Sequence, residues 1–166
     1  MSEPILQTLM GAIGSLGFAI LFNVRGQRLF FAFLGGGIGW GVCCLAGLWW
    51  PDNEALCYFI ATTALALYAE CMARVLRCPS TVMLVTGWIP LIPGGALYNS
   101  IAALVAKQMD DFVERTLHTI FLMIAMSAGI LLAMTIVHIL SPRARSRNSG
   151  NKKAIAESPA AFTETK

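Results

Sequence analysis

Five long apolar stretches, divided by short polar segments, constrain this chain more than any other feature of its sequence. They cover residues 5–24, 29–50, 55–76, 81–106 and 117–140, and each is long enough to cross the hydrocarbon core of a bilayer, which takes roughly 20 helical residues. A lone strand could not satisfy its backbone hydrogen bonds in lipid, so each stretch is expected to be helical. The sequence therefore predicts an all-α, polytopic membrane protein with five transmembrane helices.

The composition excludes the soluble classes of protein. Hydrophobic residues make up 57% of the chain and charged residues 13%, and six of the twelve Lys and Arg residues fall in positions 141–166. A soluble enzyme, a nucleic-acid-binding domain or a disordered chain would offer more polar groups to water. The five cysteines are odd in number and lack C-x-x-C spacing. We interpret them as small buried apolar residues, and expect neither a metal nor a cofactor.

The distribution of Lys and Arg predicts the orientation of the chain. With the N-terminus outside, ten basic residues face the cytoplasm and two, Lys107 and Arg115, face outward, in agreement with the positive-inside rule. Residues 1–140 form the membrane domain in this interpretation. Residues 141–166 have too little apolar surface to fold alone and are predicted to be a disordered, basic cytoplasmic tail that can contact anionic lipid.

The fourth apolar stretch contains a Pro-x-x-Pro-Gly element that a continuous helix cannot accommodate. Pro90 and Pro93 lack amide donors, and their rings clash with the carbonyl groups of Thr86 and Ile89. The break is either an interruption in a crossing helix or the tip of a re-entrant hairpin. A hairpin would place six basic residues on each side of the membrane, so the basic count favours a crossing, broken helix.

The half-helix that begins after Pro93 predicts a binding site for an anion. The amides of residues 94–97 have no intrahelical acceptors and carry partial positive charge, which suits a carboxylate near the bilayer midplane. The alternative is a structural kink whose polar groups are satisfied by neighbouring helices. The candidate substrate-binding residues are Pro90, Pro93, Gly94, Gly95, Tyr98, Asn99 and Ser100.

Other polar residues allow both functional and structural interpretations. Glu70 lies within the third stretch and is a candidate proton relay, or it forms an interfacial salt bridge with Arg74 one turn on. His118 and His138 lie at opposite ends of the fifth stretch and cannot share a metal ion. Acidic residues of the predicted outer loop either gather cations or are solvated. They are Asp110, Asp111 and Glu114.

Glycines recur at helix-packing intervals. The second stretch holds two overlapping G-x-x-x-G pairs, Gly35 with Gly39 and Gly37 with Gly41. Small residues let helix backbones approach closely in lipid, so these glycines predict tight packing or oligomerisation rather than ligand binding. Three further glycines are predicted to share one side of the first helix. They are Gly11, Gly14 and Gly17.

Several segments resemble the threonine/serine exporter family, and within it the short, YjjB-type membrane subunit. They are residues 89–98, Gly17-Phe18-Ala19, Phe22-Asn23-Val24 and Ala73-Arg74-x-x-Arg77-x-Pro79. The resemblance covers residues 5–140. It implies a bacterial inner-membrane protein that works with a second, larger membrane subunit of the family's N-terminal type. It also implies export of small amino acids or of dicarboxylates such as succinate.

The function predicted from these features is that of a membrane subunit in a two-component secondary exporter. The substrates are small carboxylate-bearing metabolites, and the driving force is expected to come from protons. The alternative is a non-transporting scaffold that stabilises a partner transporter through its glycine faces. An enzyme is not expected, because the chain has no Ser/His/Asp set, no H-E-x-x-H motif and no acid pair at a workable spacing.

Overall fold

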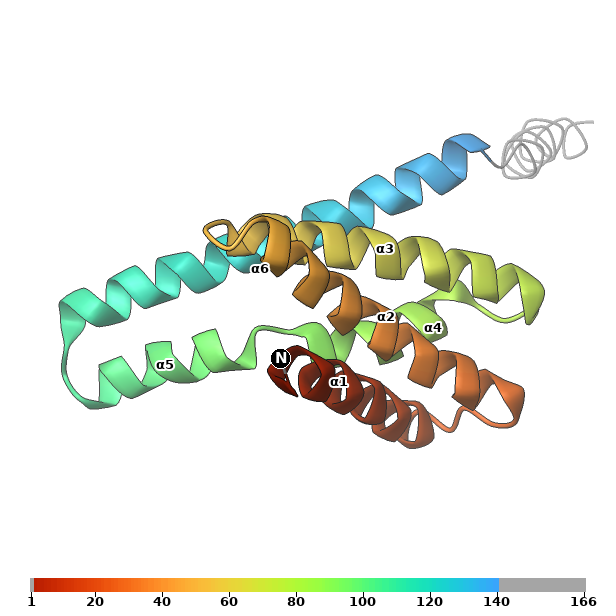
Figure 1. Cartoon of the computed structure of the whole chain (residues 1–166), viewed down its shortest axis with the longest axis horizontal. Helices are drawn as coiled ribbons and strands as arrows, with labels where there is room; N and C mark the ends of the chain where they lie inside the picture. Colours follow the sequence, from red (N-terminus) through yellow and green to blue (C-terminus); the bar gives the residue numbers. More distant parts are fainter. Residues whose placement is uncertain (1, 141–166) are drawn as a thin grey trace, which may run out of the picture. The chain divides into compact units, whose positions relative to one another are not determined.

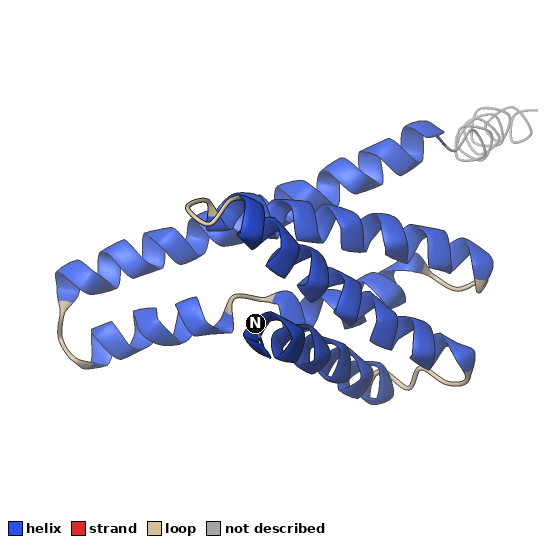
Figure 2. Ribbon diagram, viewed as in Figure 1, coloured by secondary structure: helices blue, strands red, loops and turns tan. Residues whose placement is uncertain are grey.

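The computed structural model describes residues 2–140, and these residues form helices and turns without a strand (Figures 1 and 2). The elements are α1 (Ser2–Leu21), α2 (Gln27–Trp49), α3 (Glu54–Val75), α4 (Ser80–Trp88), the 3₁₀ turn η1 (Ile89–Leu91), α5 (Gly94–Val105) and α6 (Met109–Leu140). Four helices are long and apolar enough to cross a membrane alone, and the pair Ser80–Leu91 and Gly94–Val105, bent by 48°, makes a fifth candidate span if its two halves cross together. This confirms the all-α, polytopic membrane fold with one interrupted helix.

The chain divides into two compact units, Met1–Met134 and Thr135–Lys166. Of the second unit, the structure describes residues 135–140, which form the end of α6. The packing contacts, cavities and candidate site described below lie in the first unit. The predicted cytoplasmic tail, residues 141–166, lies outside the described residues.

Three helices end at a residue in the left-handed conformation. Asn23, Arg77 and Lys107 have φ angles of 58°, 49° and 58°. In each case the following amide donates back to a carbonyl five residues earlier, as when the Val24 amide donates to Ala19 O at 2.9 Å. This arrangement satisfies carbonyl groups that the helix end would leave without donors. These turns end α1, α3 and α5.

The sixth helix begins earlier than the sequence predicts. Residues 107–116 were expected to form an outer loop, but α6 starts at Met109. Asp110 and Asp111 lie in its first turn, where carboxylates interact favourably with the helix dipole. Asp111 also pairs with Arg115 one turn on, at 3.6 Å. Hydropathy therefore located the residue at which the apolar surface begins, and not the residue at which the helix begins.

The core is built around α3, with α6 packed parallel to it. One buried cluster joins Tyr58, Ala61, Leu91, Leu122 and Met126. The second lies further along the same helices and joins Leu65, Ala66, Ala69, Met83, Leu84 and Ala133. Between the clusters, the Thr63 hydroxyl of α3 donates to Gly129 O of α6 at 3.2 Å. The two helices approach closely here because Gly129 has no side chain.

The two G-x-x-x-G pairs of α2 face different helices. A Cβ atom on Gly37 or Gly41 would contact Ala12 or Thr8 of α1 at 3.5 and 3.6 Å. Cβ atoms on Gly35 and Gly39 would instead lie 3.2 Å from Tyr68 and 3.7 Å from Leu65, both on α3. These glycines therefore allow α2 to pack between α1 and α3 within one chain.

The three glycines of α1 do not share one environment. A Cβ atom on Gly11 would overlap the Trp40 ring, and one on Gly14 would lie 3.5 Å from Pro90. Gly17 has nothing within 4 Å of its Cβ position. Within the part of the chain that the structure describes, Gly11 and Gly14 pack against other segments and Gly17 does not.

Candidate substrate site at the broken helix

Neighbouring groups satisfy the carbonyl groups that the two prolines deprive of donors. The buried Ser15 hydroxyl of α1 shares its proton between Thr86 O and Ala32 O, each at 2.8 Å. Ile89 O accepts a 3₁₀ hydrogen bond from the Ile92 amide at 3.2 Å. The carbonyls of Thr86 and Ile89 are those that Pro90 and Pro93 leave without the donor of a continuous helix.

The break is also braced from α2. The indole Nε1 of Trp40 donates to Pro90 O at 2.9 Å, and the Pro90 ring packs beside Gly14 of α1. The carbonyl groups at the break thus match the structural interpretation, in which neighbouring helices satisfy the polar groups of a kink. The amides that follow the break do not.

Two of the four amides expected to be open at the start of α5 have acceptors. The Gly94 amide donates to Ile92 O at 2.7 Å, and the Leu97 amide donates to Pro93 O at 3.1 Å. These two bonds correct the expectation for residues 94 and 97. Among the described residues, the amides of Gly95 and Ala96 have no hydrogen-bond acceptor. A helix N-terminus with open amides favours an anionic ligand.

Gly94 and Gly95 lie in open space. Both are exposed, and nothing lies within 4 Å of a Cβ atom built on either. Both belong to α5 and neither has a positive φ angle, so the fold of the described chain does not require glycine here. The absence of side chains leaves the backbone accessible to a molecule outside the chain.

The break packs beside the middle of α1, where the Pro90 ring lies against Gly14, and α5 leads from it toward the start of α3. Leu91 packs with Tyr58, in the second turn of α3. Further along the chain, Ala96 and Asn99 of α5 line a cavity together with Glu54, the first residue of α3.

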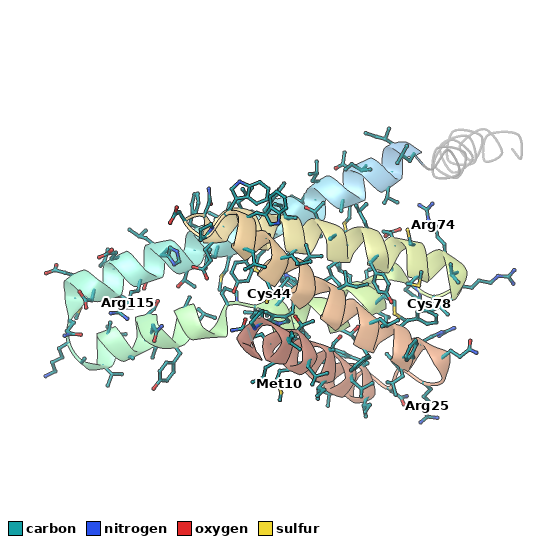
Figure 3. All side chains as sticks on the ribbon, viewed as in Figure 1. Met10, Arg25, Cys44, Arg74, Cys78 and Arg115 are labelled. Carbon is teal, nitrogen blue, oxygen red and sulfur yellow. The ribbon has the colours of Figure 1, made fainter. Side chains whose placement is uncertain are left out.

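A polar cavity of about 350 Å³ lies beside the first turns of α5. Its lining comes from three helices: Glu54 of α3, Ala96 and Asn99 of α5, and Glu114, Arg115 and His118 of α6. Arg115, which Figure 3 labels on the first half of α6, pairs with Asp111, and His118 Nε2 lies 3.5 Å from Glu54 Oε2. All four of these side chains are about half exposed, so a bound molecule can reach them.

The cavity contains groups that recognise both ends of a small charged metabolite. Arg115 and the amide of Asn99 are hydrogen-bond donors for a carboxylate, and the Glu114 carboxylate is an acceptor for an ammonium group. The open α5 terminus adds backbone donors at Ala96. This combination suits binding and release of a small ion.

The candidate residues from the sequence fall into different environments. Asn99 lines the cavity, and Pro93 is buried directly before α5. The Tyr98 side chain is 72% exposed and is not among the cavity residues. Ser100 is buried, and its hydroxyl donates to Ala96 O at 2.9 Å and lies 3.4 Å from that of Thr119. Ser100 therefore contributes to packing between α5 and α6.

Glu70 lies far along α3 from the start of α5. It is partly buried, and it follows Glu54 by 16 residues, or about 24 Å at the helical rise. A proton taken up at Glu70 would act on the α5 terminus only through a change in the helices between them.

Four charged residues of the cavity were not predicted as site residues. Glu54 lies just before the third apolar stretch, His118 lies at one end of the fifth, and Glu114 and Arg115 were placed on the outer side. The spacing of Glu114, Arg115 and His118 on one helical turn is a signal for a shared face once residues 109–116 are known to be helical. Their proximity to Glu54 depends on the packing of α6 against α3.

Comparison with known proteins agrees with this architecture. No solved structure matches the chain significantly. The family described as "Threonine/Serine exporter, ThrE" matches residues 7–136, which include the broken helix and most of every candidate span. The chain therefore belongs to the threonine/serine exporter family.

Proposed function

We propose that this chain is one membrane subunit of a two-component, proton-driven exporter of small carboxylate-bearing metabolites. The substrates are threonine/serine-type amino acids or dicarboxylates such as succinate. We place the protein in the bacterial inner membrane with its N-terminus outside and its C-terminus in the cytoplasm. Membership of an exporter family and the five-span helical fold support the transport function.

The observation that carries the proposal is the pair of open amides at the start of α5. Gly95 and Ala96 lack acceptors among the described residues, while every carbonyl freed by the prolines has a donor. Every helix start leaves amides without intrahelical acceptors, and here they adjoin two exposed glycines beside a cavity that contains Arg115. Secondary transporters use discontinuous helices of this kind to bind anionic substrate groups.

A second membrane subunit completes the site in this proposal. The side chains of Tyr98, Ile101 and Val105 on α5 are 72%, 59% and 77% exposed, beside a cavity that contains charged groups. A polar site in lipid needs protein around it, because unpaired charges are costly there. The purified chain reconstituted alone should leave substrate flux at background. Flux from the isolated chain would mean that its own oligomer completes the site.

The alternative, a scaffold without transport activity, depended on glycine faces available to a partner. Gly35, Gly37, Gly39 and Gly41 contact other helices of the same chain. An apolar groove of about 520 Å³ between α1 and α2 remains as a surface that a scaffold could use. The scaffold interpretation predicts that the partner subunit transports without this chain.

Substitution at the open glycines tests the proposed site. In the complete exporter, Gly94→Val and Gly95→Val should abolish flux, because the added side chains block approach to the α5 amides. Gly17→Val is the matched control, since Gly17 is also helical with nothing within 4 Å of its Cβ position. Assembly measured by co-purification should be the same for all three variants. Parent-level flux in Gly95→Val would exclude this site.

A further inference from the structure

The strongest further candidate is the contact between His118 and Glu54. His118 Nε2 of α6 lies 3.5 Å from Glu54 Oε2 in the first turn of α3. A histidine carries charge only when protonated, and it is the side chain whose ordinary charge change falls nearest neutral pH. The ion pair between α3 and α6 therefore exists in one protonation state of the imidazole and not in the other.

Glu54 lies between two cavities. It lines the polar cavity with Asn99 and His118, and it also lines a second cavity of about 390 Å³ between α1, α2 and α3. The second cavity includes Trp40, whose indole donates to Pro90 O in the broken helix. A change in the position of the Glu54 carboxylate thus acts beside both the α5 terminus and the residue that braces the break.

The other ionisable groups around the pair are carboxyl, guanidinium, thiol and phenol groups. On α6, Glu114 is a carboxylate and Arg115 is paired with Asp111, and α5 contributes the non-ionising Ala96 and Asn99. Thiols and phenols ordinarily ionise above neutral pH. Those lining the second cavity from α2 and α3 are Cys43, Cys44, Cys57 and Tyr58.

The geometry points to the His118–Glu54 pair as the site where the coupling proton binds at this end of the exporter. A proton from the aqueous phase adds to the His118 imidazole, and the resulting cation pairs with the Glu54 carboxylate. Loss of the proton to water reverses both steps, and no other bond changes. This inference depends on the proposed proton-driven export, and it assigns the proton to a pair beside the α5 terminus rather than to Glu70 alone.

The test compares flux with and without a pH gradient in vesicles that contain the complete exporter. For each variant, the measured quantity is gradient-driven flux divided by counterflow without a gradient. His118→Gln and Glu54→Gln should reduce this ratio to about one, and Glu54→Asp should recover part of it because the carboxylate returns. His138→Gln is the matched histidine control and should keep the parent ratio.

The outcomes separate this inference from the proposed function. If His118→Gln keeps the parent ratio, the pair does not bind the coupling proton, while the exporter proposal is unaffected. If the parent complex shows no counterflow at all, both the exporter proposal and this inference are wrong. A ratio lost in His118→Gln but kept in Glu54→Gln would also overturn the inference, because the carboxylate would have no part in it.

Discussion

At the scale of single residues, Ser15 links the first helix to the broken fourth span. Its hydroxyl is fully buried and donates to Thr86 O, which Pro90 deprives of a donor. We expect Ser15→Ala to lower the free energy of unfolding by about 1–2 kcal/mol, because the buried carbonyl is left unsatisfied. Reversible unfolding in mixed detergent measures this change.

A double-substitution cycle identifies the cause of that loss. Pro90→Ala restores an amide that can donate to Thr86 O, so Ser15→Ala should cost less in that background. Ser127→Ala is the control, because the Ser127 hydroxyl is exposed and bonds within its own helix, to Met123 O at 2.9 Å. Equal costs of Ser15→Ala in both backgrounds would contradict the assigned hydrogen bond.

The bonding at the break shows how far single residues could be predicted. Pro90 and Pro93 identify the two carbonyls that lose donors, Thr86 and Ile89, from local chain geometry alone. The donor to Thr86 comes from Ser15, 71 residues away, and the Pro90 carbonyl is bonded by Trp40, 50 residues away. Such partners depend on tertiary packing, which the local pattern does not contain.

At the scale of helices, Gly129 sets how closely α6 approaches α3. A Cβ atom there would overlap the Thr62 hydroxyl and lie 2.6 Å from Phe59 O. We expect Gly129→Ala to destabilise the protein by about 1–3 kcal/mol through overpacking, measured by the same unfolding assay. Gly47→Ala should be neutral or slightly stabilising, because its Cβ position is open. Similar effects at both positions would argue against this close helix contact.

Helix ends were predicted less well than helix existence. The apolar stretches located α2 and α3 to within two residues, because Arg and Asp-Asn turns follow the apolar surface closely there. The start of α6 was missed by eight residues, since the sequence expectation was Leu117 and the helix begins at Met109. Polar residues continue a helix beyond the apolar surface when acidic groups favour its N-terminus.

At the scale of the whole molecule, the predicted orientation can be tested by labelling. Asp52→Cys and Asp110→Cys should react with a membrane-impermeant maleimide added to intact cells, and Gln27→Cys should not, because the basic loops face the cytoplasm. Labelling of the parent protein, with its own five cysteines, provides the baseline. A reaction at Gln27→Cys without permeabilisation would reverse the orientation.

The candidate site combines parts that differ in how well a sequence reveals them. The Pro-x-x-Pro-Gly element and Asn99 are adjacent in the chain and were predicted. The cavity also draws on Glu54 and His118, which are 64 positions apart and meet through the parallel packing of α3 and α6. One sequence shows which residues are unusual for lipid, but not which of them meet.

The central claim is that the break in the fourth span provides a binding site as well as a kink. The most direct test is Pro90→Ala/Pro93→Ala, with stability and flux measured on the same preparation of the complete exporter. Restored amides should let the helix close, raising the free energy of unfolding by about 1 kcal/mol while flux is lost. A double variant that transports at the parent rate would contradict the account.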